Sequence, residues 1–243
     1  MNEKYYLFLV LAFISEILGT VSGFGSSILF VPVASLFFDF KTVLGITAIF
    51  HVFSNLSKIA LFKQGIKKLL ALKLGIPAIV FVIIGAYITT LIPTDNIELI
   101  MNIALVLLAL YLLINFNKKI QQSDANLYIG GIASGFLAGV AGTGGAIRGL
   151  TLSAFQLSKD VFIATSAVID LGVDVSRAIV YTSNGYFSKE YIFLIPFLIA
   201  ISLLGSYIGK LILKKTSEQV FRYIVLGVII VTAVFQIIKY ISI

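Results

Sequence analysis

Residues 22–28 read Ser-Gly-Phe-Gly-Ser-Ser-Ile, and residues 141–147, placed 119 positions later, read Ala-Gly-Thr-Gly-Gly-Ala-Ile. Polar residues further along each copy match at the same offset: Thr47 with Ser166, Asn55 with Asp174, Ser57 with Ser176, and Lys58 with Arg177. An ordered series of matches at one offset indicates an internal repeat. We therefore expect two related halves, residues 1–118 and 127–243, joined by a loop at 119–126.

The composition indicates the solvent in which these halves fold. Of the 243 residues, 59% are hydrophobic and 12% are charged, and the mean hydropathy is +1.07. A soluble domain carries about 25% charged residues, and one of this length has too small an interior for so many apolar side chains. The chain is predicted to be an integral membrane protein, which excludes a cytosolic enzyme, a DNA-binding domain and a secreted disulfide scaffold.

Charge and residue usage exclude several kinds of site. In a soluble protein the net charge of +7 would suggest a nucleic-acid partner, but here basic cytoplasmic loops explain it. The chain has no cysteine, so it forms no disulfide, thiolate metal site or Fe–S cluster. Its single histidine excludes a multi-histidine metal centre. We expect no nucleic-acid partner, no metal and no cofactor.

Ten apolar segments separated by polar turns predict an all-α, polytopic protein with about five segments in each half and eight to ten membrane crossings. The expected helices lie at about 5–21, 27–40, 42–62, 69–92, 97–116, 127–141, 145–157, 160–181, 190–213 and 218–240. Three of these segments, 27–40, 127–141 and 145–157, are shorter than the roughly 20 residues that cross a bilayer. We expect them to be half-helices or re-entrant elements enclosed by protein. No small-residue cleavage site follows the first segment, which is expected to be a permanent helix.

The basic loops predict opposite orientations for the two halves. In the first half, residues 63–73 carry four lysines, whereas the turn at 93–96 has no Lys or Arg. In the second half the pattern is reversed, because the loop at 184–190 has one Lys and one Glu while the later turn carries Lys214 and Lys215. Basic loops face the cytoplasm. The halves are therefore predicted to form an inverted repeat, which is an architecture of secondary transporters.

The two glycine-rich motifs are the candidate substrate site. Glycine lets a ligand approach the backbone closely, and a half-helix that begins there directs free N–H groups and the positive end of its dipole at an anion. The candidate substrate-binding residues are Gly23, Gly25, Ser26, Ser27, Gly142, Thr143, Gly144, Gly145 and Arg148. As an alternative, the glycines only permit close helix packing, and Arg148 reaches the membrane interface.

Longer segments around these motifs resemble a known family. GTVSGFGSSILFVP at 19–32 and GFLAGVAGTGG at 135–145 resemble the duplicated signature of the TauE/SafE sulfite exporter family, and Ala-Thr-Ser at 164–166 resembles another of its elements. The first copy has two serines where glycine is usual, and the second has Thr151 in the place of Pro32. The resemblance implies a membrane carrier for sulfite, sulfoacetate and other organosulfonates, or for related small carboxylates.

The third segment of each half carries polar residues on one helical face. The spacing of Thr47, His51, Asn55 and Lys58 by four, four and three residues aligns them. Ionisable groups at membrane depth cost a few kcal/mol each and normally face a protein interior or a water-filled cavity. The candidate gating or proton-coupling residues are His51, Asn55, Lys58, Asp170, Asp174 and Arg177.

Each of these polar residues also has a structural interpretation. Lys58 and Arg177 can extend from helix ends to the interface. Asp174 and Arg177 are spaced i,i+3 and can pair within one helix. A lone histidine such as His51 is often only a hydrogen-bonded core residue. Glu16, within the first segment, is available to pair with any of these cations.

The sequence thus predicts a multi-pass carrier of the cell membrane that moves small sulfur-containing or carboxylate anions, most simply outward, by alternating access. Proton coupling is a hypothesis that rests on Asp170, Asp174 and His51. A passive anion channel and a cation carrier with Asp170 and Asp174 as ligands remain alternatives. An enzyme is not expected, since the chain contains neither HExxH nor GxSxG.

Overall fold

The computed structural model describes residues 3–63, 65–93 and 121–215, with isolated positions between 99 and 110 and between 217 and 238. The helices are α1 (Glu3–Ser22), α2 (Ser27–Ala34), α3 (Phe40–Leu61), α4 (Lys68–Leu91), α6 (Asp124–Ala141), α7 (Gly145–Ser153), α8 (Lys159–Ser183) and α9 (Ile195–Leu213), with the 3-10 helix η1 (Lys189–Leu194) leading into α9. The expected helices at 97–116 and 218–240 lie mostly outside the described residues, as do residues 119 and 120 of the expected loop at 119–126. Every regular element within the described ranges is helical.

Two of the short segments end earlier than their apolar composition predicts. The helix expected at 27–40 ends at Ala34, and the one expected at 145–157 ends at Ser153. In the first case Asp39 caps the next helix, because its side chain accepts a hydrogen bond from the Thr42 amide over 3.1 Å. Hydropathy extends the first of these segments too far because the turn between Ala34 and Asp39 contains Leu36, Phe37 and Phe38 and is as apolar as the helix before it.

Helix lengths separate membrane-crossing elements from internal ones. Within the described residues, α1, α3, α4 and the continuous segment Lys189–Leu213 are long and apolar enough to cross a bilayer. With 8 and 9 residues, α2 and α7 extend only about 12–14 Å at 1.5 Å per residue, against a hydrocarbon core of about 30 Å. These two helices are therefore too short to cross. Over the residues that the structure describes, the chain is all-helical and has the long apolar helices of a membrane protein.

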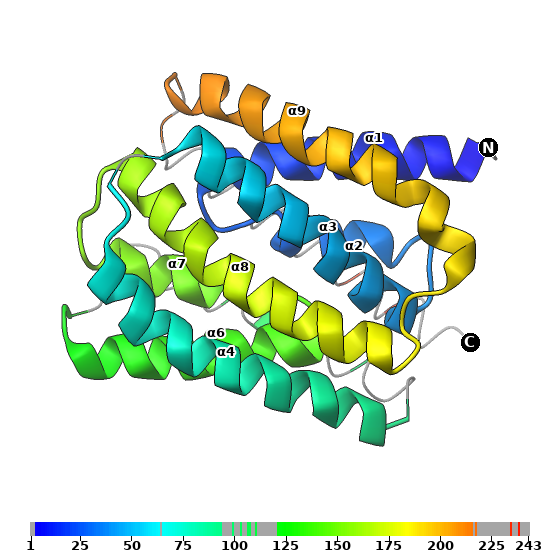
Figure 1. The fold of residues 1–243 in the computed structure, drawn as a ribbon, viewed down its shortest axis with the longest axis horizontal. Helices are drawn as coiled ribbons and strands as arrows, with labels where there is room; N and C mark the ends of the chain where they lie inside the picture. Colours follow the sequence, from blue (N-terminus) through cyan, green and yellow to red (C-terminus); the bar gives the residue numbers. More distant parts are fainter. Residues whose placement is uncertain are drawn as a thin grey trace.

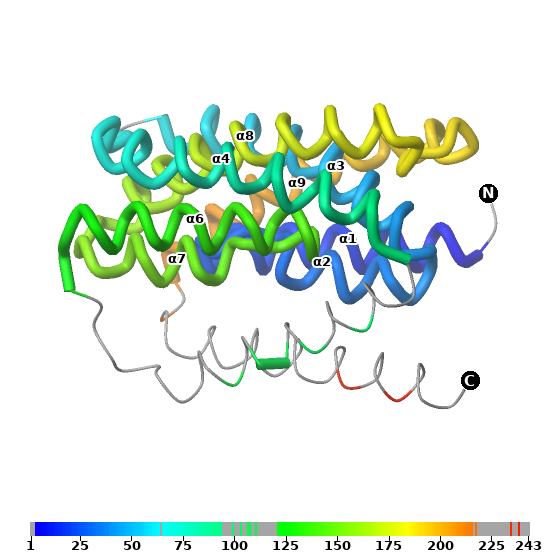
Figure 2. The backbone as a smooth tube through the Cα atoms, turned by 90° about the horizontal axis from the view of Figure 1, so that it is seen from below, coloured from blue at the N-terminus to red at the C-terminus, as the bar shows by residue number. Residues whose placement is uncertain are grey.

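The long helices form three packed pairs. Helix α1 packs against α9, α4 packs against α6, and α3 packs against α8 between these two outer pairs. In Figure 1, α1 and α3 run from the side of the N-terminus to the opposite end, whereas α6 and α8 run the other way. Helices α4 and α9 are likewise antiparallel to each other. The basic turns after α3 and after α9 consequently lie at the same end of the molecule (Figures 1 and 2).

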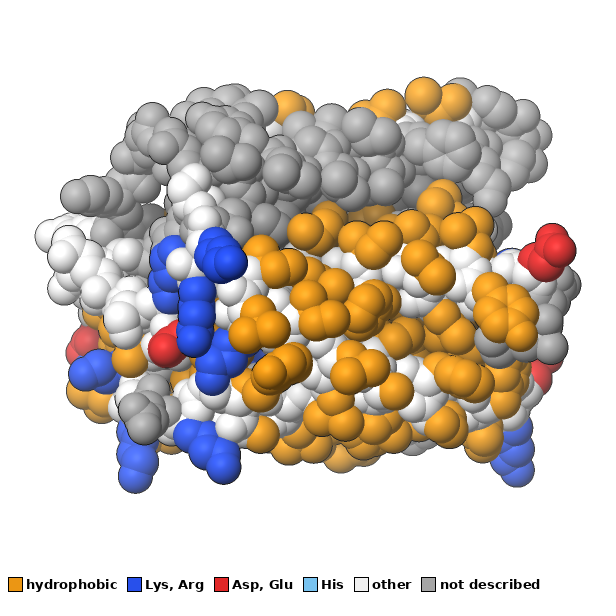
Figure 3. Space-filling model, turned by 90° about the horizontal axis from the view of Figure 1, so that it is seen from above, with side chains coloured by type: hydrophobic (Ala, Val, Ile, Leu, Met, Phe, Trp, Pro, Cys, Tyr) orange, Lys and Arg blue, Asp and Glu red, His pale blue; other side chains and the backbone are white. Residues whose placement is uncertain are grey.

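The outer surface is apolar around its middle. Figure 3 shows a broad band of hydrophobic side chains, with lysines and acidic residues gathered toward the two ends. Both α4 and α9 also expose large apolar side chains, among them Leu69, Leu72, Ile76, Leu203, Leu204 and Tyr207. A continuous apolar surface of this size marks a membrane interface in a protein of this composition. The outer pairs therefore face lipid.

Glycines let α6 approach α4 closely. A Cβ atom added to Gly131, Gly135 or Gly139 would collide with the backbone of α4, at the carbonyls of Leu74, Ala78 and Val82 respectively. Small residues at every fourth position allow such helix contacts in membranes. This outer pair is thus fixed by backbone proximity, and the polar side chains are concentrated on α3 and α8.

Candidate functional site

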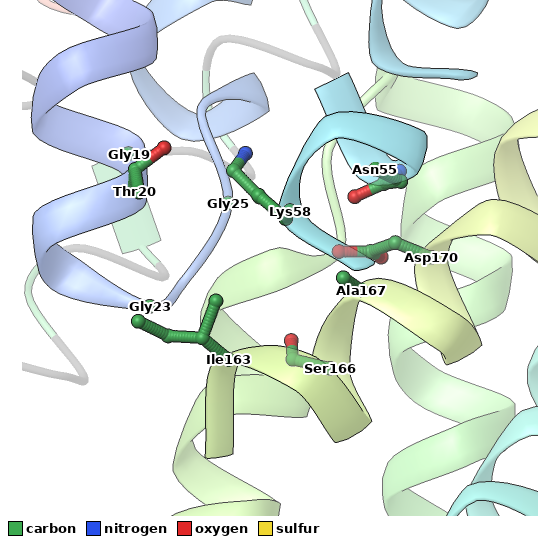
Figure 4. Close-up of a pocket in the computed structure, with 10 residues that line it drawn as sticks. All are labelled: Gly19, Thr20, Gly23, Gly25, Asn55, Lys58, Ile163, Ser166, Ala167 and Asp170. Atoms are coloured by element: carbon green, nitrogen blue, oxygen red, sulfur yellow. The ribbon is translucent and has the colours of Figure 1, made fainter. Parts of the chain in front are cut away.

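A small cavity lies where α1, α3 and α8 meet the loop between α1 and α2. Its walls are formed by Gly19, Thr20, Gly23, Gly25, Asn55, Lys58, Ile163, Ser166, Ala167 and Asp170 (Figure 4). The cavity has a volume of about 10 Å³, which is roughly the space that one water molecule needs. The cavity therefore has to widen before an anion as large as sulfite can enter.

Five of the predicted site residues line this cavity: Gly23, Gly25, Asn55, Lys58 and Asp170. Sequence reasoning did not assign a binding role to Gly19, Thr20, Ile163, Ser166 or Ala167. Their apolar or hydroxyl side chains carry no distinctive signal, although Ser166 occupies the position that corresponds to Thr47. The cavity brings together residues from both halves of the sequence.

The loop between α1 and α2 has a backbone that favours glycine. Gly23 and Gly25 have φ values of +69° and +88°, in the left-handed region that side chains disfavour. A Cβ at Gly25 would lie 3.4 Å from Arg148 Nη2 and 3.7 Å from Asp170 Oδ2. The bare backbone of Gly25 therefore faces an ion pair at the edge of the cavity.

The second glycine motif touches the first, but its residues do not line the cavity. Thr143 Oγ1 lies 3.2 Å from Ser27 Oγ, which joins the two loops. Gly144 is pressed against the Ser134 carbonyl and Gly145 against the Phe24 carbonyl, so neither site has room for a Cβ. In this conformation both glycines serve close packing.

Gly142 ends α6 in a left-handed conformation, with φ of +73°. Its carbonyl accepts a hydrogen bond from Arg177 Nη1 over 2.6 Å. Arg177 thereby holds the end of α6 against α8.

Arg148, in the middle of α7, has all of its donor groups directed at protein. It forms an ion pair with Asp170, and its Nε donates to Ser166 Oγ over 2.9 Å. Its Nη2 lies at 3.5 Å from the Phe24 carbonyl. The side chain is 4% exposed, so the alternative that Arg148 reaches the membrane interface is wrong. Arg148 instead lies behind the cavity wall, where it contacts the wall residues Ser166 and Asp170.

Asn55 and Asp174 meet between α3 and α8. The Asn55 amide donates to Asp174 Oδ2 over 2.6 Å, and Asp174 Oδ1 accepts from Arg177 Nε over 2.7 Å. The i,i+3 ion pair expected from the sequence is therefore present. Both charged side chains are at most 5% exposed, so Arg177 does not extend to the interface either.

Lys58 is paired with Glu16, which sequence reasoning left without an assigned partner. Lys58 Nζ lies 3.0 Å from Glu16 Oε1 and donates to Ser54 Oγ over 2.7 Å. Figure 4 shows its side chain extending from α3 toward α1. Lys58 is 5% exposed and Glu16 is fully buried, so Lys58 likewise stays inside the protein.

Glu16 is surrounded by hydroxyl groups from several helices, which no sequence pattern groups together. It accepts hydrogen bonds from Ser26, Ser54 and Ser206 at 2.6–2.9 Å, and from Thr20 at 3.3 Å. A carboxylate at membrane depth needs such donors because no water is present to replace them. The one available signal was an acidic residue within the apolar first segment.

His51 lies beside this carboxylate. Its Nδ1 is 2.7 Å from the Thr47 carbonyl, and its Nε2 is 2.9 Å from Ser26 Oγ. The imidazole is 3% exposed and packs edge-on against Phe30 and Phe50. Within the described residues, no three His, Asp, Glu or Cys side chains gather as a metal site. The buried polar groups are therefore arranged as ion pairs and hydrogen-bonded chains.

Comparison with known proteins places the chain in a family. Residues 7–235 match the family described as Sulfite exporter TauE/SafE. No curated protein and no solved structure matches the chain. The family is one of membrane transporters of sulfite and related anions, and the match covers nearly all of the sequence, including both glycine motifs and both polar helices. The chain belongs to the TauE/SafE sulfite exporter family.

Proposed function

We propose that this protein is a multi-pass transporter of the cell membrane that exports small sulfur-containing anions, such as sulfite and sulfoacetate, by alternating access. The single observation that carries the proposal is the position of Lys58, a buried cation on the wall of a cavity that also exposes the glycine backbone of the first motif. A cation and free backbone together suit a compact oxyanion. Lys58, Gly23 and Gly25 would bind the anion first.

The proposed architecture is an inverted repeat of residues 1–118 and 127–243, joined at 119–126. It is supported by the packing pairs, since α1 with α9 and α6 with α4 are equivalent under the sequence offset. The opposite directions of α1 and α6, and of α3 and α8, also support it. The corresponding residues Asn55 and Asp174 meet directly, as residues near a two-fold axis do.

Arg148 and Asp170 form the proposed gate between the cavity and the second glycine motif. In the present conformation Asp170 is paired with Arg148, and the second motif, Gly142, Thr143, Gly144 and Gly145, does not line the cavity. An anion that replaces Asp170 would gain the guanidinium of Arg148 and reach Ser26, Ser27 and the second motif. The small size of the cavity supports a transporter that must change conformation to move its substrate.

Proton coupling is part of the proposal and involves His51, Asp170 and Asp174 as the titratable groups. Asn55, Lys58 and Arg177 complete the proposed gating set, because they connect α1, α3 and α8 through the contacts described above. An anion that crosses with a proton carries less net charge through the low-dielectric interior, where an uncompensated charge is costly.

The test is efflux of labelled sulfoacetate from liposomes that contain the purified protein. Replacing the buried pair by Glu16→Gln with Lys58→Gln removes both charges and is expected to slow efflux at least tenfold. The matched control is Lys73→Gln with Asp124→Asn, which removes a surface ion pair and should transport normally. Normal efflux in the buried-pair variant would contradict the proposed site.

The same liposomes separate a carrier from a passive channel. In a carrier, unlabelled sulfoacetate outside the liposomes should accelerate efflux of the labelled substrate. The reason is that the binding site returns to the inner side faster with a bound anion than when it is empty. A channel shows no such acceleration, and its flux does not saturate. A pH gradient that leaves efflux unchanged would contradict proton coupling.

A further inference from the structure

The contacts among Glu16, Ser26 and His51 contain more acceptors than one hydroxyl can serve. Ser26 Oγ lies 2.6 Å from Glu16 Oε2 and 2.9 Å from His51 Nε2. A serine hydroxyl has one hydrogen to donate. If Glu16 were an ionised carboxylate and His51 a neutral ring with its proton on Nδ1, both neighbours would require that same hydrogen.

The proton on His51 Nδ1 is fixed by its surroundings. Nδ1 is 2.7 Å from the Thr47 carbonyl oxygen, which can only accept a hydrogen bond. Nδ1 must therefore carry a hydrogen, and in a neutral ring Nε2 must then accept. The neutral tautomer that would relieve the conflict at Ser26 is thus excluded by Thr47.

From this we infer that Glu16, Ser26 and His51, here called the proton trio, hold one exchangeable proton in addition to the hydrogens of the serine and of Nδ1. In one arrangement His51 is an imidazolium, Nε2–H donates to Ser26, and Ser26 donates to ionised Glu16. In the other, Glu16 Oε2–H donates to Ser26, and Ser26 donates to neutral His51. Both arrangements satisfy all three contacts.

The two arrangements interconvert without any heavy atom leaving its place. The Nε2 proton moves to Ser26 Oγ while the Ser26 hydrogen moves to Glu16 Oε2. The bonds broken are Nε2–H and Oγ–H, and those formed are Oγ–H and Oε2–H, so atoms and charge balance. The proton trio can therefore carry a proton between α3 and α1 through Ser26, the residue that directly precedes α2.

Loss of the proton changes the geometry instead. With ionised Glu16 and neutral His51, one of the two contacts to Ser26 must break, because a buried acceptor without a donor is unfavourable. Ser26 follows Gly25 in the loop between α1 and α2, and this loop lines the cavity. Ser26 itself packs directly against Gly19. Release of the proton would thus loosen this loop at the proposed substrate site.

The charged groups around the proton trio connect it to the cavity. Lys58 pairs with Glu16 and lines the cavity, and α8 contributes Asp170, Asp174 and Arg177, while α7 contributes Arg148. On α9, Lys210 is held by the Leu61 carbonyl and Ser206 binds Glu16. An anion in the cavity would draw Lys58 from Glu16, and the trio's proton would then neutralise that carboxylate.

This coupling of the proton to the anion rests on the proposed function, but the presence of the proton does not. The chain has one histidine, so nitrogen-15 labelling of histidine reports His51 alone by NMR in reconstituted membranes. Infrared spectroscopy detects a protonated carboxylic acid, which is assigned to Glu16 by its loss in Glu16→Gln. We expect either an imidazolium or a protonated Glu16 at neutral pH. A neutral Nδ1–H ring together with an ionised Glu16 would overturn the inference.

Two variants test the chain of contacts. In Glu16→Gln the amide can donate to Ser26, so His51 should be neutral with Nε2 accepting, and its signals should not respond to pH. In Ser26→Ala the shared proton is lost, so His51 should be neutral and Glu16 ionised, with neither an imidazolium signal nor a protonated-acid band. The control, Ser57→Ala, removes a buried hydroxyl that bonds only the Phe53 carbonyl of its own helix, and should preserve the wild-type spectra. Wild-type spectra in Ser26→Ala would overturn the relay.

Coupling is measured separately, by recording the same spectra with and without methanesulfonate, an anion that stays ionised at neutral pH. We expect the trio's own proton to lie on Glu16 in the anion-bound wild type and in Ser57→Ala, so that the protonated-acid band is present and the imidazolium signal is absent. Neither signal is expected in anion-bound Ser26→Ala. Binding that leaves Glu16 ionised would overturn coupling, whereas an absence of binding would contradict the proposed function and leave the spectroscopic test intact.

Discussion

The amide of Asn55 donates a hydrogen bond to the carboxylate of Asp174 over 2.6 Å, and these two residues occupy corresponding positions in the two halves of the chain. The contact joins α3 to α8 at the centre of the molecule. The two corresponding side chains differ in charge, because Asn55 is a neutral amide and Asp174 is an acid. The two halves are thus chemically unequal at the point where they meet.

Replacing Asn55 by Asp would place two carboxylates in contact. Repulsion and the loss of the amide donor are expected to destabilise the folded protein by about 1–3 kcal/mol, lowering the temperature of thermal unfolding. The control is Asn184→Asp, because the Asn184 side chain is exposed and bonds only its own helix. Equal unfolding temperatures for the two variants would contradict a stabilising role for the contact.

Gly25→Ala should impair anion binding through both strain and space. A side chain at a left-handed φ costs about 1–2 kcal/mol, and the new Cβ would stand before Arg148 and Asp170. Gly185→Ala is the matched control, since Gly185 has a φ of +75° with no neighbouring atom within 4 Å. We expect similar losses of stability in both variants and weaker methanesulfonate binding, by thermal shift, only in Gly25→Ala.

Gly144→Ala should act on folding instead of on the anion. Its Cβ would collide with the Ser134 carbonyl, which forces α7 away from α6. Overpacking of this kind typically costs 1–3 kcal/mol, so the unfolding temperature should fall. Undiminished stability together with lost anion binding would show that Gly144 contacts the substrate in this conformation.

Asp170→Asn should free Arg148 for an external anion. Removal of the competing carboxylate leaves Arg148 bound to Ser166 and to the Phe24 carbonyl. We expect methanesulfonate to bind about tenfold more tightly, equivalent to about 1.4 kcal/mol, while sulfoacetate efflux slows because the gate cannot close. Asp124→Asn, at an exposed acid, should change neither value.

The same aspartates test the alternative of a cation carrier. If Asp170 and Asp174 were metal ligands, Asp170→Asn with Asp174→Asn would abolish metal binding and leave sulfonate binding intact. We expect this double variant to alter sulfonate transport, because both acids pair with arginines beside the cavity. Calorimetry with divalent cations and efflux of sulfoacetate distinguish the two outcomes.

Lys58→Met is expected to unfold the protein more readily than the variant that also carries Glu16→Gln. Removing one partner of a buried ion pair costs about 3–5 kcal/mol, whereas removing both charges costs much less. Thermal unfolding of the two single variants and the double variant measures this coupling. Additive effects would mean that the 3.0 Å contact contributes little to stability.

Much of the helical layout could be predicted from hydropathy. Helix α3 was expected at 42–62 and is found at Phe40–Leu61, and α8 was expected at 160–181 and is found at Lys159–Ser183. The end of α2 could not be predicted, because an apolar turn has the same composition as a buried helix. Hydropathy reports burial but does not report the backbone conformation that achieves it.

The ion pairs of the candidate site could also be predicted only in part. The ion pair of Asp174 with Arg177 follows from its i,i+3 spacing alone. The partners of Lys58 and Arg148 do not, because Glu16 and Asp170 lie on other helices. A cation is costly in lipid, so the sequence favoured positions at the membrane interface as one possibility for Lys58 and Arg148. In the structure both cations are instead buried and paired with acids.

The sequence by itself determined that this chain is suited to lipid, where the helices of the described ranges lie and which polar residues repeat, because hydropathy and helical spacing act between near neighbours. Only the tertiary structure decided that Glu16, Ser26 and His51 meet, that the first glycine loop faces a cavity and that the second packs against protein. Those outcomes depend on how α1, α2 and α3 approach one another. Hydrogen-bond acceptors that are far apart in the chain then compete for the same few donors, because a buried acceptor without a donor is costly.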